Sequence, residues 1–312
     1  MHHARIPLAL TLAAALVACG DDNDGGNTGP TENIVQLAQG NPDLSILVEA
    51  VVAAELAPLL SGAGNYTVFA PTNEAFASLL TELNVSKAEL LANKPLLEAV
   101  LKYHVLTSRV AKLQIPLGKA ITTYGGGFFK IETSGTDVVI KDGRNRTSKI
   151  TATDIVATNG FVHVVDKVLL PPNKNIVETA QGIADFSILV EAVVAADLAD
   201  TLSGAGPFTV FAPTNEAFAN LLAELQVSKE ALLADKALLT AVLTYHVIPG
   251  RVLKADVVPG AQPNTVKGEN FSISAGLVIT DKRTRTSNIT STDVFTSNGV
   301  IHVIDKVILP SP

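Results

Sequence analysis

The sequence predicts an α+β protein built from two tandem copies of one domain. Its 312 residues are 47% hydrophobic and 17% charged, which is enough apolar material for two packed cores. The second half of the chain repeats the first. Within each half, segments with helical apolar spacing come first and alternating β-branched segments follow. That order is typical of helices packed on a mostly antiparallel sheet.

The repeat is clearest in one run of ten residues. Thr67–Phe76 reads TVFAPTNEAF and returns unchanged as Thr209–Phe218. The other matched segments are Asn33-Ile34-Val35 with Asn175-Ile176-Val177, Ser45 to Val52 with Ser187 to Val194, Tyr103-His104 with Tyr245-His246, and Gly160 to Val168 with Gly299 to Val307. The offset is 142 at the Tyr-His pair (245 against 103) and 139 after it (299 against 160), which indicates a small deletion near residues 134–136. A period this long indicates duplication of a whole domain.

Capping residues and apolar spacing place the first helices of the unit. A short helix is expected over residues 34–39. Asp43 or Ser45 is expected to cap a longer helix that runs to Leu60 and is apolar nearly all round, hence buried.

A strand and three more helices are expected next. The strand covers residues 66–70 and is stopped by a proline. Thr72 caps the helix that follows, Ser86 begins a capping box for another, and a further helix covers residues 93–103.

The rest of the unit has the pattern of strands. From Val105 onward, β-branched residues alternate and glycines punctuate the segments. The unit ends in a hairpin for which Asn159-Gly160 is a type I′ turn signal, and Asn298-Gly299 repeats that signal.

The N-terminus has the pattern of an export signal. A short basic start precedes an apolar run over residues 6–15, and Leu16 to Gly20 reads LVACG, which resembles the lipobox of bacterial lipoproteins. The resemblance implies that residues 1–18 are removed and that Cys19 is lipidated and held in the membrane of a bacterial cell envelope. An ordinary secretory signal beside an unpaired cysteine is the alternative. Residues 19–30 are expected to form a flexible tether, since Gly20 to Pro30 contains no apolar side chain.

Charge and cysteine content exclude several classes of function. The formal net charge of −7 gives no basic field for phosphates, so nucleic acid is not an expected partner. One cysteine excludes a disulfide framework within the chain and a cysteine-built zinc or iron–sulfur site.

The histidines argue against catalysis. Without His2 and His3 of the leader, two equivalent pairs remain, namely His104 with His163 and His246 with His302. The sequence contains neither an HExxH or HxH metal motif nor a G-x-S-x-G nucleophile elbow. We therefore expect core histidines that are satisfied by backbone hydrogen bonds, with no metal, no cofactor and no enzymatic activity.

Three motifs together resemble those of the fasciclin, or FAS1, domain. They are the TVFAPTNEAF run, the Tyr103-His104 pair and the segment from Asn159 to Leu170, in this order and twice over. The resemblance places two domains at residues 31–172 and 173–312. It implies, for each, a wedge of about seven β-strands with a layer of helices. It also implies a secreted or membrane-anchored protein that mediates adhesion, without catalytic activity.

The resemblance also implies contact residues. In animal members of the family, receptor contact is assigned to an Asp-Ile pair before the last hairpin and to the Tyr-His motif. The matching residues here are Asp154-Ile155, Tyr103-His104 and Tyr245-His246, whereas the second unit has Asp293-Val294 in place of the Asp-Ile pair.

Two further segments are open to more than one interpretation. Tyr124 and Phe128 flank three glycines and belong either to a contact surface or to the core of a hairpin. The basic cluster Arg144-Asn145-Arg146 is expected to be solvated loop charge, with contact to an anionic polysaccharide as the alternative.

These observations predict a non-catalytic, lipid-anchored protein of the cell envelope that presents two FAS1-like domains to protein or glycan partners. One alternative is an envelope binding protein for a small apolar ligand. A hydrolase is disfavoured, because a site built from the internal histidines would have to exist twice.

The anchor can be tested at Cys19, which is the only acylation candidate in the sequence. We expect Cys19→Ser to move the protein from the detergent-soluble membrane fraction to soluble or unprocessed forms, because the acyl chains supply the membrane affinity. Cell fractionation followed by immunoblotting measures this. An unchanged distribution would contradict the lipoprotein prediction.

Overall fold

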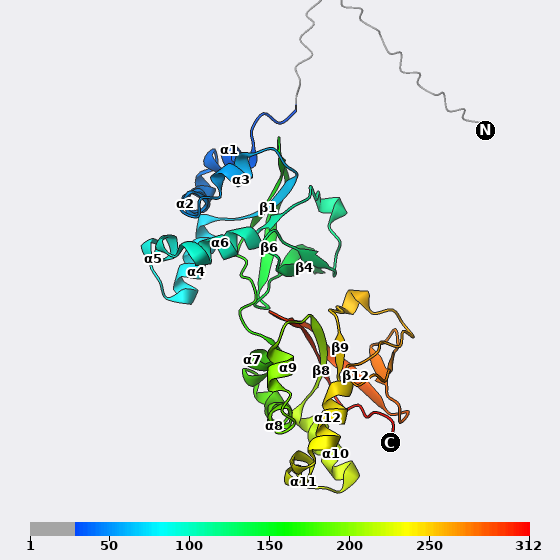
Figure 1. Cartoon of the computed structure of the whole chain (residues 1–312). Helices are drawn as coiled ribbons and strands as arrows, with labels where there is room; N and C mark the ends of the chain where they lie inside the picture. The colour runs from blue at the N-terminus through cyan, green and yellow to red at the C-terminus, as the bar shows by residue number, and fades with distance from the viewer. Residues whose placement is uncertain (1–28) are drawn as a thin grey trace, which may run out of the picture.

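The computed structural model describes residues 29–312 as two domains arranged end to end, joined by a short segment around Pro171 and Pro172 (Figure 1). The helices of domain 1 are α1 (Ile34–Gln39), α2 (Ser45–Ala53), α3 (Ala57–Ser61), α4 (Asn73–Leu83), α5 (Lys87–Ala92) and α6 (Lys94–Tyr103), with the 3-10 turns η1 (Pro42–Leu44) and η2 (Lys112–Gln114). Its strands are β1 (Tyr66–Pro71), β2 (Val105–Leu106), β3 (Ala120–Thr122), β4 (Phe128–Ser134), β5 (Asp137–Lys141), β6 (Thr147–Ala157) and β7 (Gly160–Val165).

Domain 2 repeats this order. Its helices are α7 (Ile176–Gln181), α8 (Ser187–Ala195), α9 (Ala199–Ser203), α10 (Asn215–Leu225), α11 (Lys229–Ala234) and α12 (Lys236–Tyr245), with the 3-10 turns η3 (Ala184–Phe186) and η4 (Lys254–Asp256). Its strands are β8 (Phe208–Pro213), β9 (Val247–Pro249), β10 (Ser272–Ile273), β11 (Val278–Thr280), β12 (Thr286–Thr296) and β13 (Gly299–Ile304).

Each domain has one mixed sheet, seven-stranded in domain 1 and six-stranded in domain 2. The order is β2-β1-β7-β6-β5-β4-β3 in the first and β10-β11-β12-β13-β8-β9 in the second. Only β1 with β7, and β8 with β13, pair in parallel, so the predicted α+β class and mostly antiparallel sheet are confirmed. The deletion predicted near residues 134–136 falls at the β4–β5 hairpin, whose strands are longer than β10 and β11.

The buried hydrophobic residues of each domain form two main clusters. One is built mostly from the helices and the other mostly from the strands. In domain 1 the second cluster centres on Phe69, whose ring meets the edge of the Phe129 ring at 5.2 Å. Tyr103 packs on Phe129 from α6 at 5.8 Å. Domain 2 repeats this cluster with Phe211, Tyr245 and Phe271. Each such buried ring contributes about 1.5–3 kcal/mol.

Local signals placed most helix ends correctly and one helix wrongly. Thr72 caps α4, and Ser86 forms a capping box with Glu89, as predicted. The single helix expected from Ser45 to Leu60 is instead two helices, because the chain turns at Glu55 with φ of 56°. A residue in the left-handed region ends a helix, and apolar periodicity does not reveal it.

The Asn159-Gly160 pair closes the predicted β6–β7 hairpin, but not through a type I′ turn. The loop is Thr158-Asn159, and neither residue has a positive φ. Asn159 is instead buried, and its side chain accepts from the Ile34 N–H at 3.0 Å and donates to the Leu60 and Gly62 carbonyls. Gly160 is required by close approach, since a Cβ there would lie 2.1 Å from the Tyr66 carbonyl oxygen.

The two domains meet through an apolar contact. The Phe128 ring of β4 packs on the Phe295 ring of β12, with centroids 4.8 Å apart. The Arg251 guanidinium lies over the Phe128 ring, 3.7 Å from the ring centroid. Leu253 and Val300 complete this buried cluster. Phe128 is therefore buried between domains, a position that neither interpretation of its sequence context included.

Polar contacts align the same interface. The Lys130 ammonium binds Asp293 at 2.8 Å, and Asp293 is fully buried. The Asn145 side chain accepts from the Phe295 N–H at 2.7 Å and donates to its carbonyl at 3.0 Å. Hydrogen bonds of this paired kind fix orientation as well as distance, so the domains have a defined mutual arrangement.

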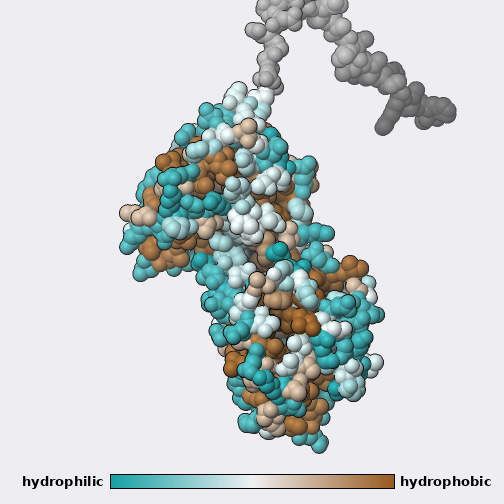
Figure 2. All heavy atoms as spheres, viewed as in Figure 1, coloured by the Kyte–Doolittle hydropathy of each residue, from teal (hydrophilic) through white to brown (hydrophobic). Residues whose placement is uncertain are grey.

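The exterior is mixed in polarity. On the face shown in Figure 2, hydrophobic atoms form small groups among hydrophilic ones on both domains. Between residues 29 and 312, no helix has both the length and the apolar character needed to cross a membrane.

Asn159 offers a test of the packing of α1 and α3 against the hairpin. We expect Asn159→Ala to lower the free energy of unfolding by about 1–3 kcal/mol. The reason is that the Ile34 N–H and the Leu60 and Gly62 carbonyls lose their hydrogen-bond partner. Chemical denaturation measures the change. The control is Asn173→Ala in the exposed connection between the domains, which should stay within about 0.5 kcal/mol of the parent. Equal losses in both variants would contradict this role.

Candidate interaction site

The Tyr-His pair lies at the end of α6, where both side chains point into the core. Tyr103 and His104 are each 1% exposed, and the Tyr103 hydroxyl donates to the Phe128 carbonyl. Tyr245 and His246 are buried in the same way at the end of α12. Neither pair has surface for a partner to contact, so the contact role implied by the resemblance does not fit these four residues.

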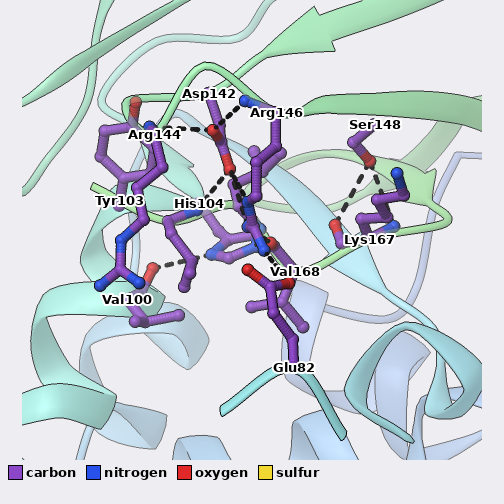
Figure 3. Close-up of polar contacts among 12 residues, drawn as sticks. Glu82, Val100, Tyr103, His104, Asp142, Arg144, Arg146, Ser148, Lys167 and Val168 are labelled. Atoms are coloured by element: carbon purple, nitrogen blue, oxygen red, sulfur yellow. Dashed lines mark hydrogen bonds and ion pairs between the residues drawn. The ribbon is translucent and has the colours of Figure 1, made fainter. Parts of the chain in front are cut away.

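The His104 ring ties the helix to the last segment of the domain (Figure 3). Its Nδ1–H donates to the Val100 carbonyl at 2.7 Å, and its Nε2 accepts from the Leu169 N–H at 2.8 Å. His246 makes the equivalent contacts with Val242 and Ile308. A ring that donates at one nitrogen and accepts at the other is neutral. Burial lowers the pKa of both histidines to about 4, because the interior disfavours the charged ring.

Both ring nitrogens of the other two histidines are also occupied by backbone groups. His163 Nε2–H donates to the Val110 carbonyl at 2.9 Å, and its Nδ1 accepts from the Asp154 N–H at 3.2 Å. His302 repeats this with Val252 and Asp293. Across residues 29–312 no three acidic, histidine or cysteine side chains are grouped as a metal site.

A buried carboxylate beside the Tyr-His pair was missed by the sequence analysis. Asp142 accepts from the backbone N–H groups of Arg144 and Arg146, each at 2.9 Å, and from that of Leu170 at 3.0 Å (Figure 3). Arg146 pairs with Asp142 at 2.8 Å and with Glu82 at 2.6 Å. The Asp-x-x-x-Arg spacing recurs as Asp281 to Arg285, and that recurrence was the available signal.

The basic cluster at residues 144–146 is therefore not solvated loop charge as expected. Arg146 holds the turn through ion pairs, and Asn145 makes the interdomain contact. Arg144 is partly buried, and desolvation lowers the pKa of its guanidinium. The expectation was wrong because the three side chains contact different neighbours, which their order in the sequence does not reveal.

Asp154 is the exposed member of the predicted contact set. Its φ of 59° turns the chain, and its Oδ1 accepts from the Lys112 N–H at 2.7 Å, which caps η2. The Asp154 residue is itself exposed to solvent. Asp293 caps η4 in the same way at 2.9 Å, but its second oxygen binds Lys130. The same carboxylate is thus open in one domain and occupied in the other.

The remaining candidates are distributed over the molecule. Ile155 is partly buried against the helical core of domain 1, and Tyr124 is 40% exposed at the β3–β4 turn. Phe128 lies in the interdomain contact described above. Cys19 lies outside the described residues.

The buried histidines predict a defined dependence of stability on pH. Between about pH 6.5 and 4 the unfolded chain binds protons at His104 and His246 that the native chain does not. The free energy of unfolding should therefore fall on acidification, by up to about 1.4 kcal/mol per pH unit for each histidine. Urea midpoints measured at intervals from pH 7 to 4 report this slope.

The matched variant is His104→Ala. It should lose about 1–3 kcal/mol at pH 7, because the Val100 carbonyl and the Leu169 N–H are left without partners. It should also show a shallower slope with pH than the parent, since one titrating group is gone. A variant with the parental midpoint and slope would contradict a structural role for this ring.

Comparison with known proteins agrees with this arrangement. A family described as "Fasciclin domain" matches residues 42–171 and 184–310. The chain is 32% identical over 260 residues to transforming growth factor-beta-induced protein ig-h3 of Sus scrofa, covering 82% of this chain and 36% of the relative. It is 48% identical over 149 residues to protein sll1483 of Synechocystis sp., covering 47% of this chain and 79% of the relative.

A solved structure is also similar, namely a FAS1 domain pair from the insect cell adhesion molecule Fasciclin I. Its identity is 21% and its TM-score 0.44, with 86% of this chain and 98% of that chain covered. The chain spans about a third of the length of ig-h3. The family match, by contrast, covers most of both domains. This protein belongs to the fasciclin domain family and carries two of its domains in tandem.

Proposed function

We propose that this protein is a non-catalytic interaction protein of a bacterial cell envelope, lipid-anchored through Cys19, which presents its two fasciclin domains to protein or polysaccharide partners. The observation that carries the proposal is that the histidine side chains, which are the residues best suited to acid–base chemistry, make structural hydrogen bonds. All four histidines of the described residues are occupied by backbone groups on both ring nitrogens. Side chains fixed in this way stabilise a scaffold.

Exposed surface supports the same function. In domain 1 the carboxylate of Asp154 reaches solvent from a turn held rigid by η2 and by the His163 ring. A surface group held by backbone hydrogen bonds is already ordered before a partner arrives, and it therefore loses little conformational entropy on binding. The relatives ig-h3 and periostin, which are also fasciclin proteins, support an interaction role.

The alternative is a binding protein for a small apolar ligand. One leucine-rich cavity in domain 2, of about 190 Å³, lies among α10, α11 and α12, next to Arg283. Its counterpart in domain 1 measures only about 60 Å³. The matched cavities beneath α1 and α7 are about 30 Å³ each, which is room for one or two waters. The interaction role is favoured because the larger apolar cavities differ between the domains, whereas the Asp154 turn is held rigid and exposed on domain 1.

The function is tested with beads that carry the mature chain, attached through its N-terminal tether. We expect these beads to retain cells or extracellular matrix of the source bacterium severalfold better than uncoated beads. The beads should also release no product from ester, glycoside or phosphoester substrates. Asp154→Asn keeps the cap on η2 but removes the charge, and it should weaken retention.

The matched control is Asp185→Asn, which removes an exposed carboxylate from η3 of domain 2 and should leave retention unchanged. Retention equal to that of uncoated beads would contradict an adhesive role. Turnover of any substrate, or a stoichiometric lipid in organic extracts of the purified protein, would favour the alternatives instead.

A further inference from the structure

The interdomain contact consists of two different surfaces. Domain 1 contributes a covering edge, formed by Ala120, Phe128, Lys130 and Asn145. Domain 2 contributes a docking face, formed by Arg251, Leu253, Asp293, Phe295 and Val300. Because the domains share one fold, each surface has a counterpart on the other domain.

Among residues 29–312, no segment covers the counterpart of the docking face on domain 1. We call it the open face, and it consists of Arg109, Leu113, Asp154, Val156 and Phe161. Arg109 matches Arg251, Asp154 matches Asp293, and Val156 with Phe161 matches Phe295 with Val300, so that the aromatic and the aliphatic residue have exchanged places. Arg109 and Asp154 thereby repeat the charged residues of the docking face and Phe161 supplies its aromatic ring, whereas Ala111 stands in place of Leu253 and Leu113 in place of Ala255.

Exposure on the open face is unusual for its apolar residues. Leu113 is 97% exposed on η2, and Val156 is 45% exposed on β6. The position of Leu113 corresponds to Ala255, whose Cβ lies so near domain 1 that a Cβ added to Gly118 would be 3.2 Å away. At the second position, Phe295 of domain 2 packs on Phe128 of domain 1, whereas Val156 of domain 1 is exposed to water. Exposed apolar residues beside a charged group are typical of an interaction surface.

We propose that the open face of domain 1 docks the sheet edge of a further fasciclin-type domain, one that carries an aromatic ring and a lysine where this chain has Phe128 and Lys130. This inference rests on the proposed function and names the partner of the surface that includes Asp154. The ring stacks on the Arg109 guanidinium, which already lies 5.0 Å from the Phe161 ring. The lysine binds the free oxygen of Asp154, as Lys130 binds Asp293.

The partner is not a second copy of this chain. Its own Phe128 and Lys130 are already taken by its domain 2. The corresponding edge of domain 2 has Asn270, Ser272 and Thr284 in place of Phe128, Lys130 and Asn145, and therefore has neither a ring nor a lysine at these positions. The open face accordingly selects another protein.

The open face lies next to the point where the tether enters domain 1. The Thr158 N–H, two residues after Val156, donates to the Glu32 carbonyl at 2.9 Å. A partner on this face is consequently placed beside the tether. A membrane surface is the competing occupant, and the experiment below distinguishes the two.

The test extends the full chain at its N-terminus with a second copy of residues 31–174, so that a covering edge is tethered beside the open face. A single reporter thiol is placed at Val156→Cys of the original domain 1, with Cys19→Ser removing the native thiol. At the millimolar effective concentration of a short linker, a docked copy should slow maleimide labelling about tenfold or more. Changing Lys130→Glu in the added copy should restore the labelling rate.

The matched control places the reporter at Val194→Cys on α8, which is 56% exposed and remote from the interface, and whose labelling rate should not change. An unchanged rate at position 156 would overturn the proposal. Slowing that persists with Lys130→Glu would overturn it as well, because the lysine contact is part of the proposal. Slowing by vesicles of phosphatidylethanolamine and phosphatidylglycerol, without slowing by the added copy, would assign the face to a membrane instead.

A second measurement uses the natural chain length and does not depend on the folding of an added copy. Phe295→Lys places a cation against Lys130 and frees the covering edge. The freed edges should then bind the open faces of other copies, so that the sedimentation coefficient rises with concentration. Adding Val156→Lys should return the protein to a monomer. A monomeric Phe295→Lys variant would overturn the proposal, whereas loss of bead retention with docking intact would count only against the proposed function.

Discussion

The fold depends on how the last segment of each domain is hydrogen-bonded. After β7 the chain runs through the core without joining the sheet, so its N–H groups need other acceptors. His104 accepts from Leu169 and Asp142 accepts from Leu170, and domain 2 repeats both contacts. Unmade hydrogen bonds in this position would each cost about 1–3 kcal/mol. This requirement explains why a histidine and an aspartate lie in an otherwise apolar interior.

The sequence was sufficient to predict the fold class, the duplication and most helix ends, because these depend on local signals. Thr72 and Ser86 begin helices where their capping patterns indicated. Prediction failed where one residue serves a distant neighbour. Glu55 breaks a helix whose apolar pattern continues, and Asn159 is needed by α1 and α3 rather than by its own turn.

The candidate site was harder to predict, since burial and partners decide it. Four of the contact candidates are core residues, namely Tyr103, His104, Tyr245 and His246, while Asp154 is exposed. Asp142 was missed because a lone aspartate in a glycine turn is ordinarily solvated. Phe128 was ambiguous because its neighbour belongs to the other domain, 167 positions away (295 against 128). The two copies differ most in such surface residues, although their internal hydrogen bonds are nearly the same.

The polar edge of domain 2 has a consequence for assembly. When a contact between two unlike surfaces repeats from one unit to the next, the units form an open filament. The filament stops growing at an end that lacks one of the two surfaces. Domain 2 lacks the ring and the lysine of the covering edge, because it has Asn270, Ser272 and Thr284 in place of Phe128, Lys130 and Asn145. The pair of domains therefore has a direction, and by this contact it can be extended only at the open face of domain 1. Such polarity prevents uncontrolled polymerisation of a protein made of repeated domains.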